Sequence, residues 1–122
     1  MAKILLIDDD PTLLSLEAQI LTAAGHEVAT TANGKEAVQL FASSPFDLVI
    51  TDVIMPEKDG LETISHLRRK HPKLKIIAVS GGGMVKSEDY LEIARKLGAA
   101  QTLSKPFAAD QLLKAVDKVL SS

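Results

Sequence analysis

Short apolar runs of strand length alternate along this chain with longer segments of helical periodicity. The unbroken run Ile-Leu-Leu-Ile at 4–7 is typical of a strand that is covered on both faces of a sheet. Strands are predicted at 3–7, 26–30, 46–51, 74–79 and 100–104. Because strands that alternate with helices form βαβ units with right-handed crossovers, the pattern predicts a parallel sheet with helices on both faces.

Capping and stop signals mark the ends of the helices. Asp10 is predicted to cap a first helix that has Pro11 in its first turn, and Gly25 is predicted to end it. The residues that recur at helical spacing within this segment are Leu13, Leu16, Ile20 and Ala24. The later helices are predicted to start near Asn33-Gly34, Asp59-Gly60, Ser87 and Ala109.

Five strands and five helices in 122 residues fit one α/β domain of the flavodoxin-like (βα)5 type. Its strand order is 2-1-3-4-5, and its switch point lies between strands 1 and 3. Periodicity does not itself establish strand order, so the order is an expectation from the fold. It would bring Asp8 and Asp9, after the first strand, beside Asp52, after the third.

Composition argues against several classes of function. A net charge of −2 gives no electrostatic footprint for nucleic acid or for an anionic lipid surface. The absence of cysteine rules out a disulfide framework and a thiolate metal site. No apolar stretch approaches the length of a membrane span. We therefore expect a cytoplasmic domain spanning residues 1–122, with no nucleic-acid or membrane partner and no output domain.

Residues suited to phosphate chemistry follow four of the predicted strands. Acids come after the first and third, Ser80 after the fourth, and Lys105 after the fifth. The carboxyl ends of parallel strands meet at one edge, where an α/β sheet builds its site. An ammonium group and a hydroxyl both donate hydrogen bonds to phosphate oxygens. We therefore expect a phosphate-sized site at this edge, in which Pro106 holds Lys105 in an extended conformation.

The acids predict a metal ion. Two carboxylates about 4 Å apart repel by roughly 4 kcal/mol at an effective dielectric of about 20. A cluster such as Asp8, Asp9 and Asp52 therefore either raises a pKa or binds a cation. Mg²⁺ uses one or two carboxylates, keeps water ligands and accepts phosphate oxygens. Asp10, in contrast, is expected only to cap the first helix.

Four segments taken together resemble one known family: ILLIDDDP at 4–11, DLVITDVIMP at 47–56, DG at 59–60 and KPF at 105–107. Over essentially its whole length the chain resembles a response-regulator receiver domain of two-component signalling, of the single-domain chemotaxis-regulator kind. The resemblance implies that Asp52 accepts a phosphoryl group from a histidine kinase or a small phosphodonor.

The resemblance also implies the ligands at the site. Mg²⁺, or Mn²⁺, would be bound by Asp9, by Asp52 and by the main-chain carbonyl of Ile54, with Asp8 acting through water. Lys105 and Ser80 would bind the phosphoryl oxygens. In-line transfer to a carboxylate needs charge neutralisation and positioning above all, and this set of residues supplies both.

Partners and mode of action follow from the same resemblance. A sensor histidine kinase or phosphotransfer protein would act on the chain, and a downstream protein would dock on a surface that phosphorylation switches. The chain would be a monomer or a phosphorylation-dependent dimer. It would catalyse only its own phosphorylation and dephosphorylation, so we do not expect an enzyme with a separate substrate.

Three departures from the family pattern bear on signalling. Glycines at 81–83 follow Ser80. They form either a switch loop that becomes ordered when phosphate binds or a lengthened loop without a role. Thr102 stands where many receivers have an aromatic residue, so a coupled aromatic switch cannot be carried over. Ile54 and Gly82 flank the path of the hydrolytic water and cannot orient it, which predicts slow self-dephosphorylation.

Other functions fit parts of the same pattern. The motif Asp8-x-Asp10-x-Thr12 also fits haloacid-dehalogenase-like phosphatases, with Asp8 as nucleophile and Asp10 as acid/base. Against this, no acidic pair follows Lys105 outside a helical pattern. A flavin or nucleotide binder on this fold would need a fingerprint that the chain lacks. An interaction module that is never phosphorylated would not need the complete set of acids, hydroxyl and amine.

Overall fold

The computed structural model describes residues 2–52, 60–80, 87–105 and 107–121, with the side chains of 60, 61 and 87–91 left out. Its strands form one parallel sheet in the order β2-β1-β3-β4-β5, as the flavodoxin-like fold requires. They are β1 (Lys3–Ile7), β2 (Glu27–Thr31), β3 (Leu48–Asp52), β4 (Lys75–Ser80) and β5 (Gln101–Ser104). The predicted fold class and strand order are confirmed, and the later strands begin one or two residues after their predicted starts.

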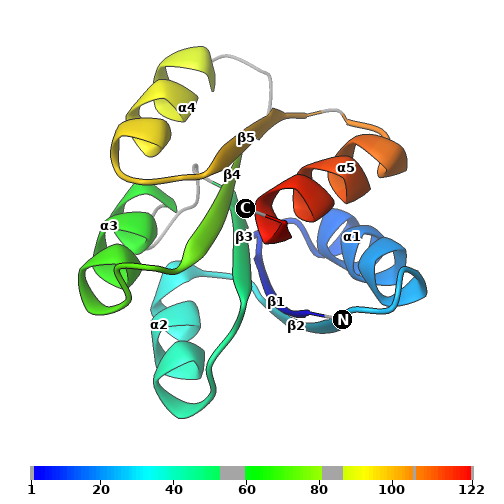
Figure 1. Cartoon of the computed structure of the whole chain (residues 1–122), viewed down its shortest axis with the longest axis horizontal. Helices are drawn as coiled ribbons and strands as arrows, with labels where there is room; N and C mark the ends of the chain where they lie inside the picture. Colours follow the sequence, from blue (N-terminus) through cyan, green and yellow to red (C-terminus); the bar gives the residue numbers. More distant parts are fainter. Residues whose placement is uncertain (1, 53–59, 81–86, 106, 122) are drawn as a thin grey trace.

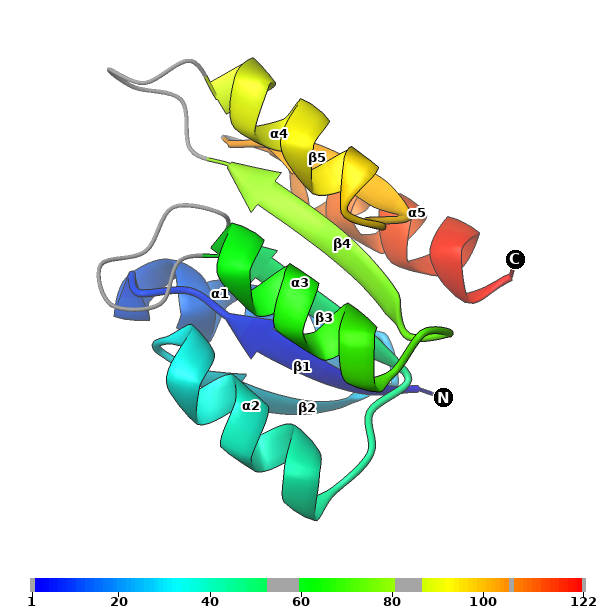
Figure 2. The ribbon, with the colours of Figure 1, turned by 90° about the vertical axis from the view of Figure 1, so that its left-hand side faces the viewer.

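The helices cover both faces of the sheet. They are α1 (Pro11–Ala23), α2 (Gly34–Ser43), α3 (Gly60–Lys70), α4 (Ser87–Lys96) and α5 (Ala109–Leu120). Helices α1 and α5 lie on one face, and α2, α3 and α4 lie on the other (Figures 1 and 2). None of the helices in the described part of the chain is both long and apolar enough to cross a bilayer.

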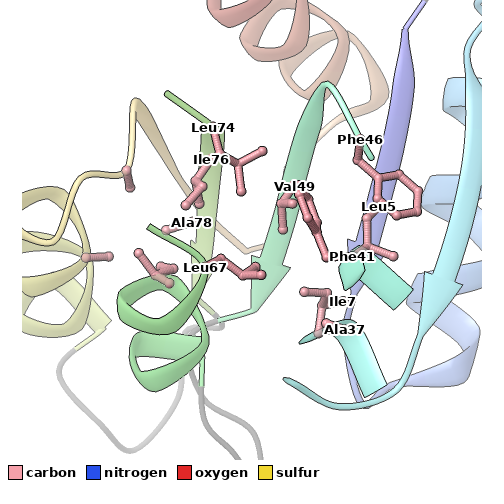
Figure 3. Packing of buried hydrophobic residues seen from close by; sticks show 13 residues of the cluster. Leu5, Ile7, Ala37, Phe41, Phe46, Val49, Leu67, Leu74, Ile76 and Ala78 are labelled. Carbon is pink, nitrogen blue, oxygen red and sulfur yellow. The ribbon is translucent and has the colours of Figure 1, made fainter. Parts of the chain in front are cut away.

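Alternation of side chains along the buried strands produces two cores, one on each face. Leu5, Val49 and Ile76 point to the face of α2, α3 and α4, where they pack in one cluster with Phe41 and Leu67 (Figure 3). Their neighbours in sequence point to the other face and pack against α1 and α5. That second cluster includes Ile4, Leu6, Leu48, Ile50, Ile77, Leu21, Leu112 and Val116. Because both faces are covered, the strands read as continuous apolar runs.

Side-chain caps begin the first two helices where the sequence predicts them. The Asp10 carboxylate accepts hydrogen bonds from the backbone N–H groups of Thr12 (3.0 Å) and Leu13 (3.3 Å). Asn33 accepts from the backbone N–H of Glu36 at 2.8 Å. These bonds satisfy N–H groups that have no partner within the helix.

Two glycines end helices in the left-handed region, at φ +95° for Gly25 and +116° for Gly98. At Gly98 space is also limited, because an added Cβ would lie 2.7 Å from Nε of Arg68. The Arg68 guanidinium donates to the carbonyl oxygens of Gly98 (2.6 Å) and Pro72 (2.7 Å). It therefore links the carboxyl ends of α3 and α4.

The inward face of α1 agrees only in part with the set of residues that spacing singled out. Leu16 is 52% exposed, whereas Leu21 is fully buried. Glu17 and Leu21 are buried on this helix, and Leu14, Ala18 and Ile20 pack against the core shared with the sheet and α5. Ile20 of the predicted set is therefore confirmed as a core residue, whereas Leu16 is not. The consequence is that a glutamate occupies the middle of a buried helix face.

We expect the two leucines of α1 to differ sharply in their effect on stability. Leu21→Ala should lower the free energy of unfolding by about 2–5 kcal/mol, because it removes fully buried methyl groups and leaves a cavity. The matched control Leu16→Ala should cost less than about 0.5 kcal/mol. Urea unfolding of both variants measures the difference. Equal losses would mean that the inward face of α1 is assigned incorrectly.

Candidate functional site

Three carboxylates meet at the carboxyl edge of the sheet. Parallel pairing of β1 with β3 sets Ile7 beside Thr51, so the next residues, Asp8 and Asp52, are neighbours. Both aspartates are buried, and Asp9 is exposed. One carboxylate oxygen from each of Asp8, Asp9 and Asp52 lies within 4.8 Å of the others. The acids that the sequence predicts to converge therefore do so, in a group of a size that suits one divalent cation.

Lys105 supplies the positive charge at this edge. Its Nζ donates hydrogen bonds to Oδ2 of Asp8 (2.8 Å) and Oδ2 of Asp52 (3.0 Å), from 97 and 53 residues away in the sequence. Its backbone N–H donates to the carbonyl oxygen of Ser80 at 2.8 Å, which positions the residue after β5 beside β4. Burial alone would lower the pKa of Lys105, but the hydrogen bonds to the two carboxylates outweigh it and raise that pKa. Lys105 therefore stays charged at neutral pH.

The hydroxyl of Ser80 is buried at the end of β4 and has no partner in the described part of the chain. Its Oγ has no hydrogen bond to any residue that the structure describes, although the residue is fully buried. Val79, the preceding residue, pairs with Asp52 across β3 and β4. A buried hydroxyl without a partner costs about 1–3 kcal/mol. Ser80 thus has an unused donor close to the carboxylates, which suits the oxygen of a bound oxyanion.

Asp8 and Asp10 have different partners. Asp8 Oδ1 accepts the backbone N–H of Asp10 at 2.9 Å, and Oδ2 accepts Lys105. The backbone N–H of Asp8 also donates to the carbonyl oxygen of Thr31 at 3.2 Å, which holds the residue at the edge of the sheet. Asp10 is exposed and uses its carboxylate to cap α1. This geometry gives Asp10 a structural role, where a haloacid-dehalogenase-like mechanism would need an acid/base.

The sequence prediction missed one acid near the site, Glu17 of α1. It is only 4% exposed, and its Oε2 has no hydrogen-bond partner among the residues described. Burial is the largest cause that raises the pKa of Glu17, to about 7, and the negative charge of Asp8 adds to it. Asp52 and Asp10 raise this pKa further, and Lys105 opposes them. The signal that could have revealed Glu17 is its place among Leu14, Ala18 and Leu21.

Other predicted residues lie outside the described part of the chain or have a different role. Ile54 and the glycines at 81–83 lie outside the described residues, so the predicted carbonyl ligand and the two interpretations of the loop stay predictions. Thr102 is half-buried on β5, and its Oγ1 accepts a hydrogen bond from Nη2 of Arg95 at 3.0 Å. Arg95 also pairs with Glu92 at 2.8 Å. A polar contact between α4 and β5 therefore stands at the position where many receivers have an aromatic residue.

The buried carboxyl of Glu17 should make stability depend on pH. Its pKa is about 7 in the folded protein and near the ordinary 4.5 when unfolded, so between these values the folded state binds the extra proton. Its contribution to the free energy of unfolding is fully present below pH 4.5 and is lost as the pH rises through 7, by about 3 kcal/mol in total. Glu17→Gln should remove this dependence, as measured by urea unfolding in EDTA from pH 4.5 to 8.

The exposed acid Glu27 provides the control for this titration. Glu27 has a side chain that is 72% exposed, so Glu27→Gln should leave the pH profile of stability unchanged. If the wild-type and Glu17→Gln profiles run parallel over the whole range, the carboxyl of Glu17 does not titrate as its burial implies.

Known proteins share both the sequence pattern and the structure. The profile of the response regulator receiver domain family matches residues 4–117. The chain is 36% identical over 121 residues to the DNA-binding transcriptional regulator NtrC of Azospirillum brasilense, covering 99% of this chain but only 24% of that protein. It is 35% identical over 119 residues to the chemotaxis protein CheY of Listeria monocytogenes, covering 97% and 98% of the two chains.

A solved structure agrees with the sequence relatives. The crystal structure of the receiver domain of NtrX from Brucella abortus superposes with a TM-score of 0.92 at 29% identity, covering 98% of each chain. The family match leaves the haloacid-dehalogenase-like alternative without support. The chain therefore belongs to the response regulator receiver domain family, whose members are phosphorylated on an aspartate in two-component signalling.

Proposed function

We propose that Asp52 is the phosphoacceptor of this receiver domain and that a sensor histidine kinase, a phosphotransfer protein or a small phosphodonor supplies the phosphoryl group. The observation that carries the proposal is the contact of Lys105 Nζ with both Asp8 and Asp52 inside the three-carboxylate cluster. Asp52 ends the central strand β3, so its carboxylate lies in the middle of the site edge.

Transfer to Asp52 would replace the bond between phosphorus and the donor atom with a bond from phosphorus to a carboxylate oxygen. The donor atom leaves with the electron pair, and the transferred group carries its charge on three oxygens. Lys105 already touches Asp52, so its ammonium can follow that charge onto a phosphoryl oxygen. The buried hydroxyl of Ser80 has a donor available for another oxygen. Positioning and charge neutralisation by these groups would provide most of the rate.

The same carboxylates would hold Mg²⁺, or Mn²⁺. Asp9 and Asp52 would ligate the ion together with the carbonyl of Ile54, and Asp8 would act through water. When bound, the ion neutralises charge on the transferring phosphoryl group. The fit rests on three oxygen donors within 4.8 Å and on the preference of hard cations for such donors. The chain would in this way promote only its own phosphorylation and dephosphorylation.

Signal output would pass to a partner protein rather than directly to nucleic acid. The contact between Arg95 and Thr102 lies on the surface formed by α4 and β5, and it would couple that surface to β5 without an aromatic residue. The named NtrC relative is a DNA-binding regulator, but this chain spans only 24% of it. The net charge of −2 gives no electrostatic footprint for nucleic acid.

Intact mass after incubation with acetyl phosphate and Mg²⁺ tests the proposal. The wild type should gain the mass of one phosphoryl group, and Asp52→Asn should gain none, because the nucleophilic carboxylate is gone. Asp47→Asn is the matched control, since Asp47 is exposed and its carboxylate accepts a hydrogen bond from the backbone N–H of Lys3, away from the site. Phosphorylation of Asp52→Asn at the wild-type level, or labelling of Asp8, would contradict the proposal.

Removing the ammonium should affect metal binding and phosphorylation in opposite directions. In Lys105→Met, Asp8 and Asp52 lose their bonded cation, so Mg²⁺ should bind about tenfold or more tightly. Phosphorylation by acetyl phosphate should slow, because a phosphoryl oxygen loses its positive partner. Calorimetric titration with Mg²⁺ and the rate of mass gain measure the two effects. Lys118→Met, an exposed lysine of α5, is the control.

A further inference from the structure

We propose that Glu17 is a fourth acid of the cation site, which increases the affinity of the Asp8, Asp9 and Asp52 cluster for Mg²⁺ without ligating the ion. The inference deepens the proposed function and rests on the cation site described there. Glu17 would act on the ion through its negative charge and without contacting it. It lies on α1, two helical turns after the Asp10 cap, and no feature of the receiver pattern in the sequence pointed to it.

The position of Glu17 in the fold is the first support. Its neighbours on the inward face of α1 are apolar and pack in the core shared with α5: Leu14, Ala18 and Leu21. A carboxyl group buried in such surroundings is unfavourable unless other groups compensate for it. Among the described residues nothing bonds to Oε2 of Glu17, although the residue is only 4% exposed. A structural role alone therefore does not account for an acid here.

The charges around Glu17 are the second support. Three of the charged groups that act on it belong to the site, namely Asp8 after β1, Asp52 at the end of β3 and Lys105 after β5, and the fourth is Asp10, the cap of α1. Burial and the three aspartates oppose its negative charge, and only Lys105 favours it. A divalent cation held by Asp8, Asp9 and Asp52 would add two positive charges near Asp8 and Asp52. Glu17 would then attract the ion from within a region of low dielectric, where such attraction is strong.

Glu17 would not ligate the ion directly. Among the described residues, the carboxylate oxygens that gather within 4.8 Å of one another come from Asp8, Asp9 and Asp52, and Glu17 is not in that group. It therefore acts at longer range, and its effect on the ion is smaller than that of a ligand. We expect a change of about tenfold in the dissociation constant for Mg²⁺ when the charge is removed.

Calorimetric titration of the full chain with MgCl₂ at pH 8 and low salt, without a phosphodonor, tests the proposal. Glu17→Gln keeps the shape and removes the charge, and it should bind Mg²⁺ about tenfold more weakly than the wild type. Glu17→Asp keeps the charge and should stay within about threefold, which a purely structural role would not predict. Glu27→Gln removes an equal charge at an exposed site and should bind as the wild type does.

Glu17→Leu covers the case in which glutamine is poorly accommodated, because leucine suits the apolar neighbours and should raise stability while weakening Mg²⁺ binding. Equal dissociation constants for the wild type, Glu17→Gln and Glu17→Leu would overturn the proposal. Acetyl phosphate labelling separates this outcome from failure of the proposed function. At saturating Mg²⁺ the Glu17 variants should still be phosphorylated, whereas a wild type that binds no Mg²⁺ would refute the cation site itself.

Discussion

The ammonium group of Lys105, held between the buried carboxylates of Asp8 and Asp52, is the contact on which the arrangement of this site depends. It joins the residue after β5 to the ends of β1 and β3, across the intervening strand β4. Two anions with little access to water would otherwise repel each other at the sheet edge. The contact balances charge in the resting domain, and in the proposed mechanism the same cation meets the phosphoryl group.

Two buried polar groups near the acids have no hydrogen-bond partner among the described residues. Elsewhere the strands bury aliphatic side chains in two well-packed clusters, with their backbone groups paired in the sheet. Near the acids, Ser80 Oγ and Glu17 Oε2 are buried without a partner among the described residues. Such groups reduce stability. Their position near the three carboxylates is consistent with a site arranged for an ion and an oxyanion, at some expense in stability.

Local signals in the sequence predicted the fold because each has a local physical cause. Unbroken aliphatic runs such as 4–7 have no polar face, so they must be covered on both sides. The Asp10 cap and the stop at Gly25 depend on a few neighbouring backbone groups, and both occur as predicted. The convergence of Asp8 and Asp52 followed from the rule that parallel strands end at one edge. The later strand boundaries were less accurate, since pairing partners decide where a strand begins.

The elements, the parallel sheet and the acids that meet could be predicted from local patterns, because these depend on periodicity and on polarity at strand ends. Which side chains of α1 are buried depends instead on tertiary packing. Ile20 of the predicted set packs in the core, but packing against the sheet and α5 buries Glu17 and Leu21 and leaves Leu16 exposed. The hydrogen bond from Arg95 of α4 to Thr102 of β5 likewise depends on tertiary packing. Contacts of this kind join elements that local sequence patterns describe one at a time.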